Sequence, residues 1–128
     1  MRSHISSALT LLSDKTSPDY RNSIKESICA VEAMSRAIAG KPSATLGDAL
    51  RKIEKSGAIK WHPSLGKAFE QLYGYTNDAD GIRHALKDAG DLPVEDATFM
   101  LVACSAFVNY LTAKAAEVGL RLGACAPN

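Results

Sequence analysis

The sequence predicts an all-α protein, a compact bundle of about six helices. Apolar residues recur at spacings of three and four along several segments, no segment of useful length alternates between apolar and polar residues, and Gly and Pro stand between the periodic segments. The chain has 128 residues, of which 46% are hydrophobic and 23% charged, so it can bury a core without metals or disulfides. We therefore expect one helical domain over residues 1–118, followed by a flexible tail over residues 119–128.

Six helices are expected in chain order, at about residues 4–13, 19–39, 45–56, 62–72, 79–89 and 93–118. Asp19 and Thr45 suit the start of a helix, because their side-chain oxygens accept hydrogen bonds from free backbone N–H groups. Pro63 stands at a first-turn position, where its missing N–H costs nothing. Gly40 suits a helix end. Residues 74–78, rich in turn formers, are expected to form a loop.

The charge balance and the apolar runs limit the kinds of partner, and any RNA contact would have to be local. Fifteen Lys plus Arg against fourteen Asp plus Glu give a net charge of +1, so no global field draws the chain onto nucleic acid or an anionic membrane. The first residues lack the apolar segment of a secretory signal, and the apolar run 97–108 is about half as long as a membrane span. We expect that run to form a buried core helix and the protein to be cytoplasmic, without membrane contact.

The isolated cysteines and histidines suit structural roles. Three widely spaced cysteines fit a reduced intracellular protein. Cys29 and Cys104 lie in apolar runs, where a free thiol behaves as a small hydrophobe. His62 is expected to cap or pack at a helix start, and His4 to be solvated. The sequence contains no phosphate-binding loop and no dinucleotide-binding, metalloprotease or calcium-binding motif, so no cofactor or metal is expected.

Four polar residues of the predicted helix 79–89 fall on one face, about 100–200° around the axis from its apolar side. They are Asp80, Arg83, His84 and Lys87. Asp80 and His84 are four residues apart, so the carboxylate can orient the imidazole ring, and Lys87 adds a second cation. This pattern favours acid–base chemistry on a phosphate, with His84 moving a proton and Arg83 binding the developing negative charge. The alternative is a solvated helix face with one ion pair.

Glu32 and Arg36 form a second candidate pair on the predicted helix 19–39. The acid precedes the base by four residues, which is the favourable order on a helix. One interpretation is an ordinary surface ion pair. In the other, these side chains reach across to the first group, with Glu32 orienting Arg83 or His84 and Arg36 contacting the substrate.

Several segments, spanning about residues 5–114, carry a family resemblance. They are 19–28, 30–33, 45–50, 62–65, 73–85 and 99–110, the clearest being Tyr73-Gly-Tyr-Thr-Asn-Asp-Ala-Asp-Gly-Ile-Arg-His-Ala85. These segments resemble the C-terminal domains of AbiJ-like and related abortive-infection proteins, which are similar to the HEPN superfamily. The resemblance implies a small helical bundle that dimerises and acts in phage defence or as a toxin. Many members of that superfamily are metal-independent ribonucleases.

The active site of that family places an Arg, then four to six residues, then a His, near a dimer interface. Arg83 matches this Arg, and the nearest His is its neighbour His84, while the positions four to six residues later hold Lys87, Asp88 and Ala89. The resemblance implies attack of the RNA 2′-OH on the adjacent phosphate, with His84 as acid–base and Arg83 as phosphate clamp. A symmetric dimer would bring two such pairs to one groove.

Three functions follow from these observations. The first is a HEPN-like phage-defence or toxin domain that acts as a dimeric, metal-independent endoribonuclease, with Asp80 and Glu32 orienting the catalytic pair. The second is a non-catalytic dimerisation or sensing module of a larger abortive-infection protein, which serves a regulatory partner or fused effector domain, because the spaced His is missing. The third is a bundle that binds a nucleotide or another anion through Arg83 and Lys87.

Overall fold

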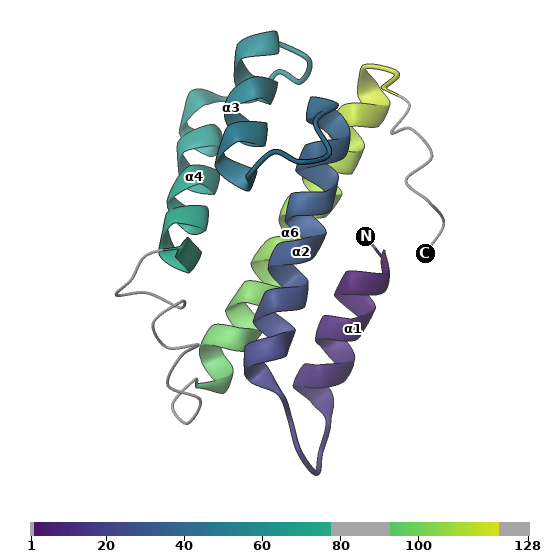
Figure 1. Ribbon diagram of the computed structural model, residues 1–128, viewed down its shortest axis with the longest axis vertical. Helices are drawn as coiled ribbons and strands as arrows, with labels where there is room; N and C mark the ends of the chain where they lie inside the picture. Colours follow the sequence, from purple (N-terminus) through teal and green to yellow (C-terminus); the bar gives the residue numbers. More distant parts are fainter. Residues whose placement is uncertain (1, 78–92, 121–128) are drawn as a thin grey trace.

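A computed structural model describes residues 2–77 and 93–120, and all regular structure within them is helical (Figure 1). The helices are α1 (Arg2–Ser13), α2 (Tyr20–Ala39), α3 (Leu46–Ser56), α4 (Pro63–Asn77) and α6 (Val94–Glu117). The prediction of an all-α bundle is therefore confirmed. The described residues hold five helices, and the helix expected at 79–89 lies outside them, as does the tail from residue 121 onward.

Two helices begin at the capping residues that the sequence predicts. The carboxylate of Asp19 accepts a hydrogen bond from the backbone N–H of Asn22 (3.1 Å), and the hydroxyl of Thr45 accepts one from the N–H of Asp48 (3.2 Å). These bonds satisfy N–H groups that a helix start leaves free, so α2 and α3 begin directly after their caps. α2 ends at Gly40, whose φ of 68° lies in the left-handed region that glycine adopts without strain.

The expected loop at 74–78 is wrong for residues 74–77, which continue α4. Gly74 lies inside the helix, where glycine costs about 1 kcal/mol relative to alanine. The preceding turns carry Phe69 and Leu72, which pack against the core. An anchored helix extends by one hydrogen bond for each residue added, so propagation from these packed turns outweighs the turn preference of the segment.

α2 and α6 lie side by side along the long axis of the molecule and form its centre (Figure 1). α1 packs against both of them, while α3 packs against α2 and α4 against α3. The core between the helices contains side chains that are at most 1% exposed, among them Ile24, Met34, Met100 and Leu111. Burial of these apolar groups supplies the main stabilising contribution to the bundle.

Two polar contacts attach α1 to α2. The buried hydroxyl of Ser23 donates to the carbonyl oxygen of Ala8 (2.7 Å), which satisfies a group that would be costly to bury alone. Nδ1 of His4 lies 2.5 Å from Oε2 of Glu26, and both side chains are half-buried. His4, which we expected to be solvated, is partly covered, because α1 folds back on α2 and brings residue 4 beside residue 26.

α6 is long and apolar enough to cross a membrane by length and composition, the one such helix in the described part of the chain. The core helix of a soluble protein passes the same test. One side of α6 faces α2 and is buried, as expected for the run 97–108, and includes Met100, Cys104 and Phe107. Its other side carries Phe99 and Val102, which are 58% and 62% exposed.

Candidate functional site

The structure describes two of the six predicted site residues. Glu32 and Arg36 lie on α2. The other four fall within residues 78–92, outside the described residues: Asp80, Arg83, His84 and Lys87. The structure does describe both attachments of that segment, which follows Asn77 at the end of α4 and precedes Pro93, the N-cap of α6.

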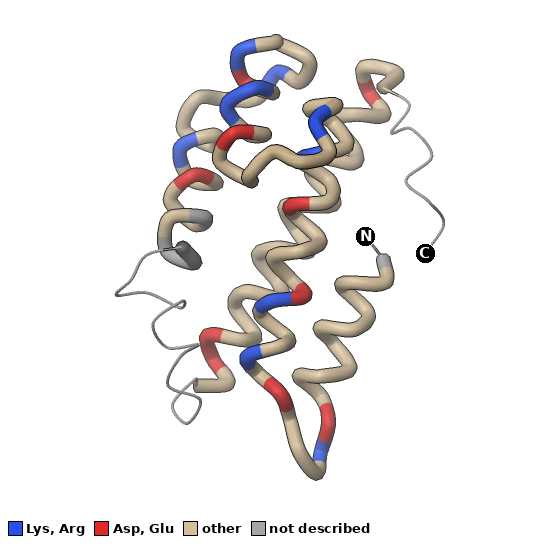
Figure 2. The backbone as a smooth tube through the Cα atoms, in the orientation of Figure 1, with Lys and Arg blue, Asp and Glu red and all other residues tan. Residues whose placement is uncertain are grey.

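The predicted pairing of Glu32 with Arg36 is present in the structure. Nη2 of Arg36 lies 3.2 Å from Oε2 of Glu32, and the two side chains are about one third exposed. Nε of Arg36 also donates to the carbonyl oxygen of Ala44 (2.7 Å), in the loop between α2 and α3. Arg36 thus ties this loop to α2, and the charged residues along α2 can be followed in Figure 2. The roles of Glu32 and Arg36 toward a substrate stay predictions.

An aromatic cluster holds α4, and with it the first attachment of the segment. The rings of Phe69 and Phe107 stack with centroids 3.6 Å apart and planes inclined by 15°, which joins α4 to α6. The ring of Trp61 lies edge-on to the ring of Phe69, with the ring centroids 5.8 Å apart. At the start of α4, Nδ1 of His62 accepts a hydrogen bond from the N–H of Ser64 (3.1 Å), so the predicted capping role of His62 is confirmed.

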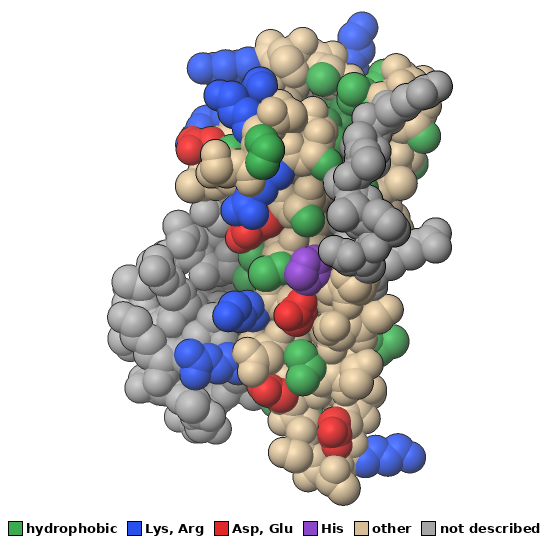
Figure 3. Space-filling view, turned by 45° about the vertical axis from the view of Figure 1, so that its right-hand side comes forward, with side chains coloured by type: hydrophobic (Ala, Val, Ile, Leu, Met, Phe, Trp, Pro, Cys, Tyr) green, Lys and Arg blue, Asp and Glu red, His purple; other side chains and the backbone are tan. Residues whose placement is uncertain are grey.

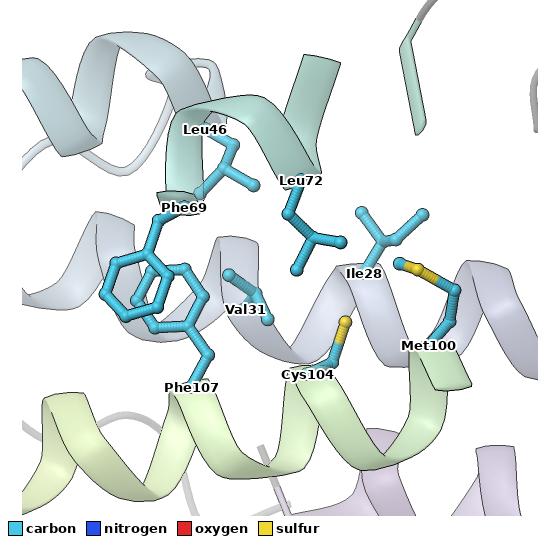
Figure 4. Close-up of a pocket in the computed structure, with 8 residues that line it drawn as sticks. All are labelled: Ile28, Val31, Leu46, Phe69, Leu72, Met100, Cys104 and Phe107. Carbon is cyan, nitrogen blue, oxygen red and sulfur yellow. The ribbon is translucent and has the colours of Figure 1, made fainter. Parts of the chain in front are cut away.

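A cavity with an apolar lining lies beneath α4, between it and the two central helices (Figure 4). Its lining residues are Ile28, Val31, Leu46, Phe69, Leu72, Met100, Cys104 and Phe107. Burial raises the pKa of the Cys104 thiol to about 12, so this thiol stays protonated and is a poor nucleophile. Burial also raises the pKa of Cys29. The expectation that Cys104 acts as a small hydrophobe is confirmed, and the cavity holds no catalytic group.

The outer face of α6 is a feature that the sequence reasoning missed. Five exposed residues without charge follow one another at spacings of three and four along it, and we call them the α6 stripe: Phe99, Val102, Ala106, Asn109 and Ala113. Residues at these spacings share one helix face. α6 is apolar around most of its circumference, so the sequence alone does not indicate which side is covered.

Among the residues that the structure describes, no group of three His, Cys, Asp or Glu side chains is placed to hold a metal ion. Comparison with known proteins finds no family model, no curated protein and no solved structure that matches this chain. The geometry therefore defines the chain by its fold class, an all-helical bundle. A fold class alone does not assign a function, so the functional argument depends on the candidate site and its surroundings.

Proposed function

We propose that this chain is a HEPN-like phage-defence or toxin domain that works as a dimeric, metal-independent endoribonuclease. The reacting group is the RNA 2′-OH, which attacks the adjacent phosphorus atom. His84 takes the proton of that hydroxyl, the bond from phosphorus to the 5′-oxygen breaks, and a proton returned from the imidazole neutralises the leaving oxygen. The products are a 2′,3′-cyclic phosphate and a 5′-hydroxyl, so no water and no metal ion enters the first step.

The other predicted site residues support this reaction. Arg83 binds the phosphate oxygens and stabilises the negative charge that develops on them. Lys87 binds a neighbouring phosphate of the RNA, while Asp80 orients the imidazole ring. Arg36, whose Nε is bonded to the loop before α3, contacts the strand farther from that pair. Glu32 already holds the guanidinium of Arg36, so its contribution as a positioning residue acts through that side chain.

The α6 stripe is the observation that best supports a dimer. It begins at Phe99, six residues after Pro93, which is about 9 Å along a helix axis. A second copy packed on this stripe through a two-fold axis parallel to α6 would bring its own Pro93 to the same end of the interface. The two Pro93 residues, each directly after a segment 78–92, would then lie close together, as a shared groove requires. The stripe bears no charge, so two copies of it do not repel each other.

The dimer predicts a change of mass when the stripe is charged. Phe99→Asp is expected to convert a dimer into a monomer at micromolar concentration, because a two-fold contact would bury two unpaired carboxylates. Light scattering measures this directly. The matched control is Leu65→Asp on α4, where the leucine is 40% exposed and outside the stripe, and this variant is expected to remain dimeric. If the wild-type protein is a monomer under these conditions, the proposed dimer is incorrect.

The function itself is tested by incubating the purified protein with several RNAs in EDTA. We expect cleavage, with 2′,3′-cyclic phosphate on the upstream product, and no cleavage where the nucleotide before the cut carries a 2′-deoxy sugar. Absence of cleavage on every RNA would end the proposal. A dimer without cleavage would favour the second function, a non-catalytic dimerisation or sensing module, which the α6 stripe fits equally well.

A further inference from the structure

A second surface lies away from the predicted site, over α3 and the loop that precedes it. Residues of this loop and of the outer side of α3 line an open hollow, which we call the α3 hollow. Its charged lining residues are Lys41, Asp48, Arg51, Lys52 and Lys55. Figure 2 shows these basic positions on α3 and its loop, and Figure 3 shows basic side chains gathered toward the same end of the molecule.

The charge of the α3 hollow differs from that of the rest of the protein. Its lining carries four basic side chains and one acidic side chain, a net charge of +3. Because the whole chain carries a net charge of +1, all other residues together carry a net charge of −2. A polyanion is therefore attracted to the α3 hollow, a preference that the overall charge conceals.

Three of the four cations are available to a ligand. The guanidinium of Arg51 pairs with the carboxylate of Asp48, and this hydrogen bond is the main cause that holds the pKa of Asp48 below its ordinary value. Lys41, Lys52 and Lys55 have no carboxylate of any described residue within 4.0 Å. Ammonium groups bind phosphate oxygens as point charges without strict geometry, so these lysines suit a row of phosphates.

The lining favours nucleic acid over a membrane or a protein partner. It contains no aromatic residue, and the large exposed apolar side chains of the described chain lie on α1, α4, α6 and just after α6. The α3 hollow thus lacks the apolar groups that insert into a bilayer or anchor a protein interface. It also lacks a platform for stacking bases, so contacts here would be to the phosphate backbone and independent of sequence.

We infer that the α3 hollow is a binding surface for the phosphates of single-stranded RNA, contacted by Lys41, Lys52 and Lys55. This inference rests on the proposed function, in which RNA is the substrate, and adds where the strand is held. Figure 1 places α3 at the opposite end of the molecule from the start of α6. The hollow therefore binds the strand at the end of the molecule opposite the start of α6, and contributes affinity to binding.

The test measures binding by fluorescence anisotropy of a labelled, unstructured RNA 12-mer in EDTA. The full chain carries His84→Ala, so binding is recorded without cleavage. The three phosphate contacts of the hollow are expected to contribute about −2 to the slope of the logarithm of affinity against the logarithm of salt concentration, in addition to the contacts proposed for Arg83, Lys87 and Arg36. Lys52→Gln/Lys55→Gln should make the observed slope less steep by about 1.4 and weaken binding roughly tenfold at low salt. Asp48→Asn removes the acid of the hollow and should strengthen binding.

The matched control is Lys15→Gln/Lys67→Gln, which removes two exposed lysines outside the hollow and should leave affinity and slope nearly unchanged. Equal weakening by both double variants would overturn the inference, because it would mean that only total charge matters. Tight binding of ATP without binding of the 12-mer would also overturn it, in favour of a small nucleotide. Failure of the wild type to cleave RNA would end the proposed function and leave this binding result unaffected.

Discussion

Phe107→Ala is expected to lower the free energy of unfolding by about 3–5 kcal/mol. Phe107 is 4% exposed, and its ring stacks on Phe69, so the substitution opens a cavity where α4 meets α6. The surrounding helices are held by other contacts and can collapse into that space only in part. Urea denaturation followed by circular dichroism measures the loss.

Two controls separate packing from the mere loss of an apolar group. Phe107→Leu keeps most of the volume while losing the stacked ring, and is expected to cost less than about 1.5 kcal/mol. Leu65→Ala, at a position 40% exposed on α4, should change stability by about 0.5 kcal/mol or less. If Phe107→Ala costs no more than Leu65→Ala, the packing of α4 on α6 described above is incorrect.

His84→Ala is expected to lower the rate of RNA cleavage in EDTA by about 10²–10⁴-fold, because that is the usual contribution of a positioned acid–base group. The predicted helix places His84 on a polar face, so the free energy of unfolding should change little. Initial rates at saturating RNA, compared with urea denaturation of the same preparations, give both quantities.

The matched control for this prediction is His62→Ala. His62 is exposed, and its ring caps the start of α4, so its loss is expected to cost about 1 kcal/mol of stability while cleavage is retained. An equal loss of cleavage in both variants would mean that the rate follows the integrity of α4, and His84 would then have no chemical role.

Much of the fold could be predicted because it depends on local chemistry. Asp19 and Thr45 accept hydrogen bonds from residues three positions later, and Gly40 adopts its left-handed conformation within its own turn, so neighbouring residues suffice to predict these helix ends. The end of α4 could not be predicted in this way. It depends on Phe69 meeting Phe107, a contact between residues 38 positions apart, which no local turn preference reveals.

In the candidate site, too, contacts within one helix could be predicted from the sequence and contacts between elements could not. The pairing of Glu32 with Arg36 lies within one helix and follows from their spacing, whereas the bond from Arg36 to the carbonyl oxygen of Ala44 depends on the path of the loop after α2. The α3 hollow escaped the sequence reasoning because total charge averages over all faces of the molecule. Counting charge separately for residues 40–56 would have indicated it, since this stretch carries four basic and two acidic side chains.

The central claim is that two copies of the chain assemble one RNA-cleaving groove, and mixing two inactive variants tests it most directly. Arg83→Ala and His84→Ala are prepared separately, then mixed in equal amounts, allowed to exchange subunits, and assayed in EDTA. If Arg83 of one copy acts with His84 of its partner, half of the dimers contain one intact pair, and the mixture should recover about a quarter of wild-type cleavage. A mixture that stays as inactive as its components would contradict the shared groove.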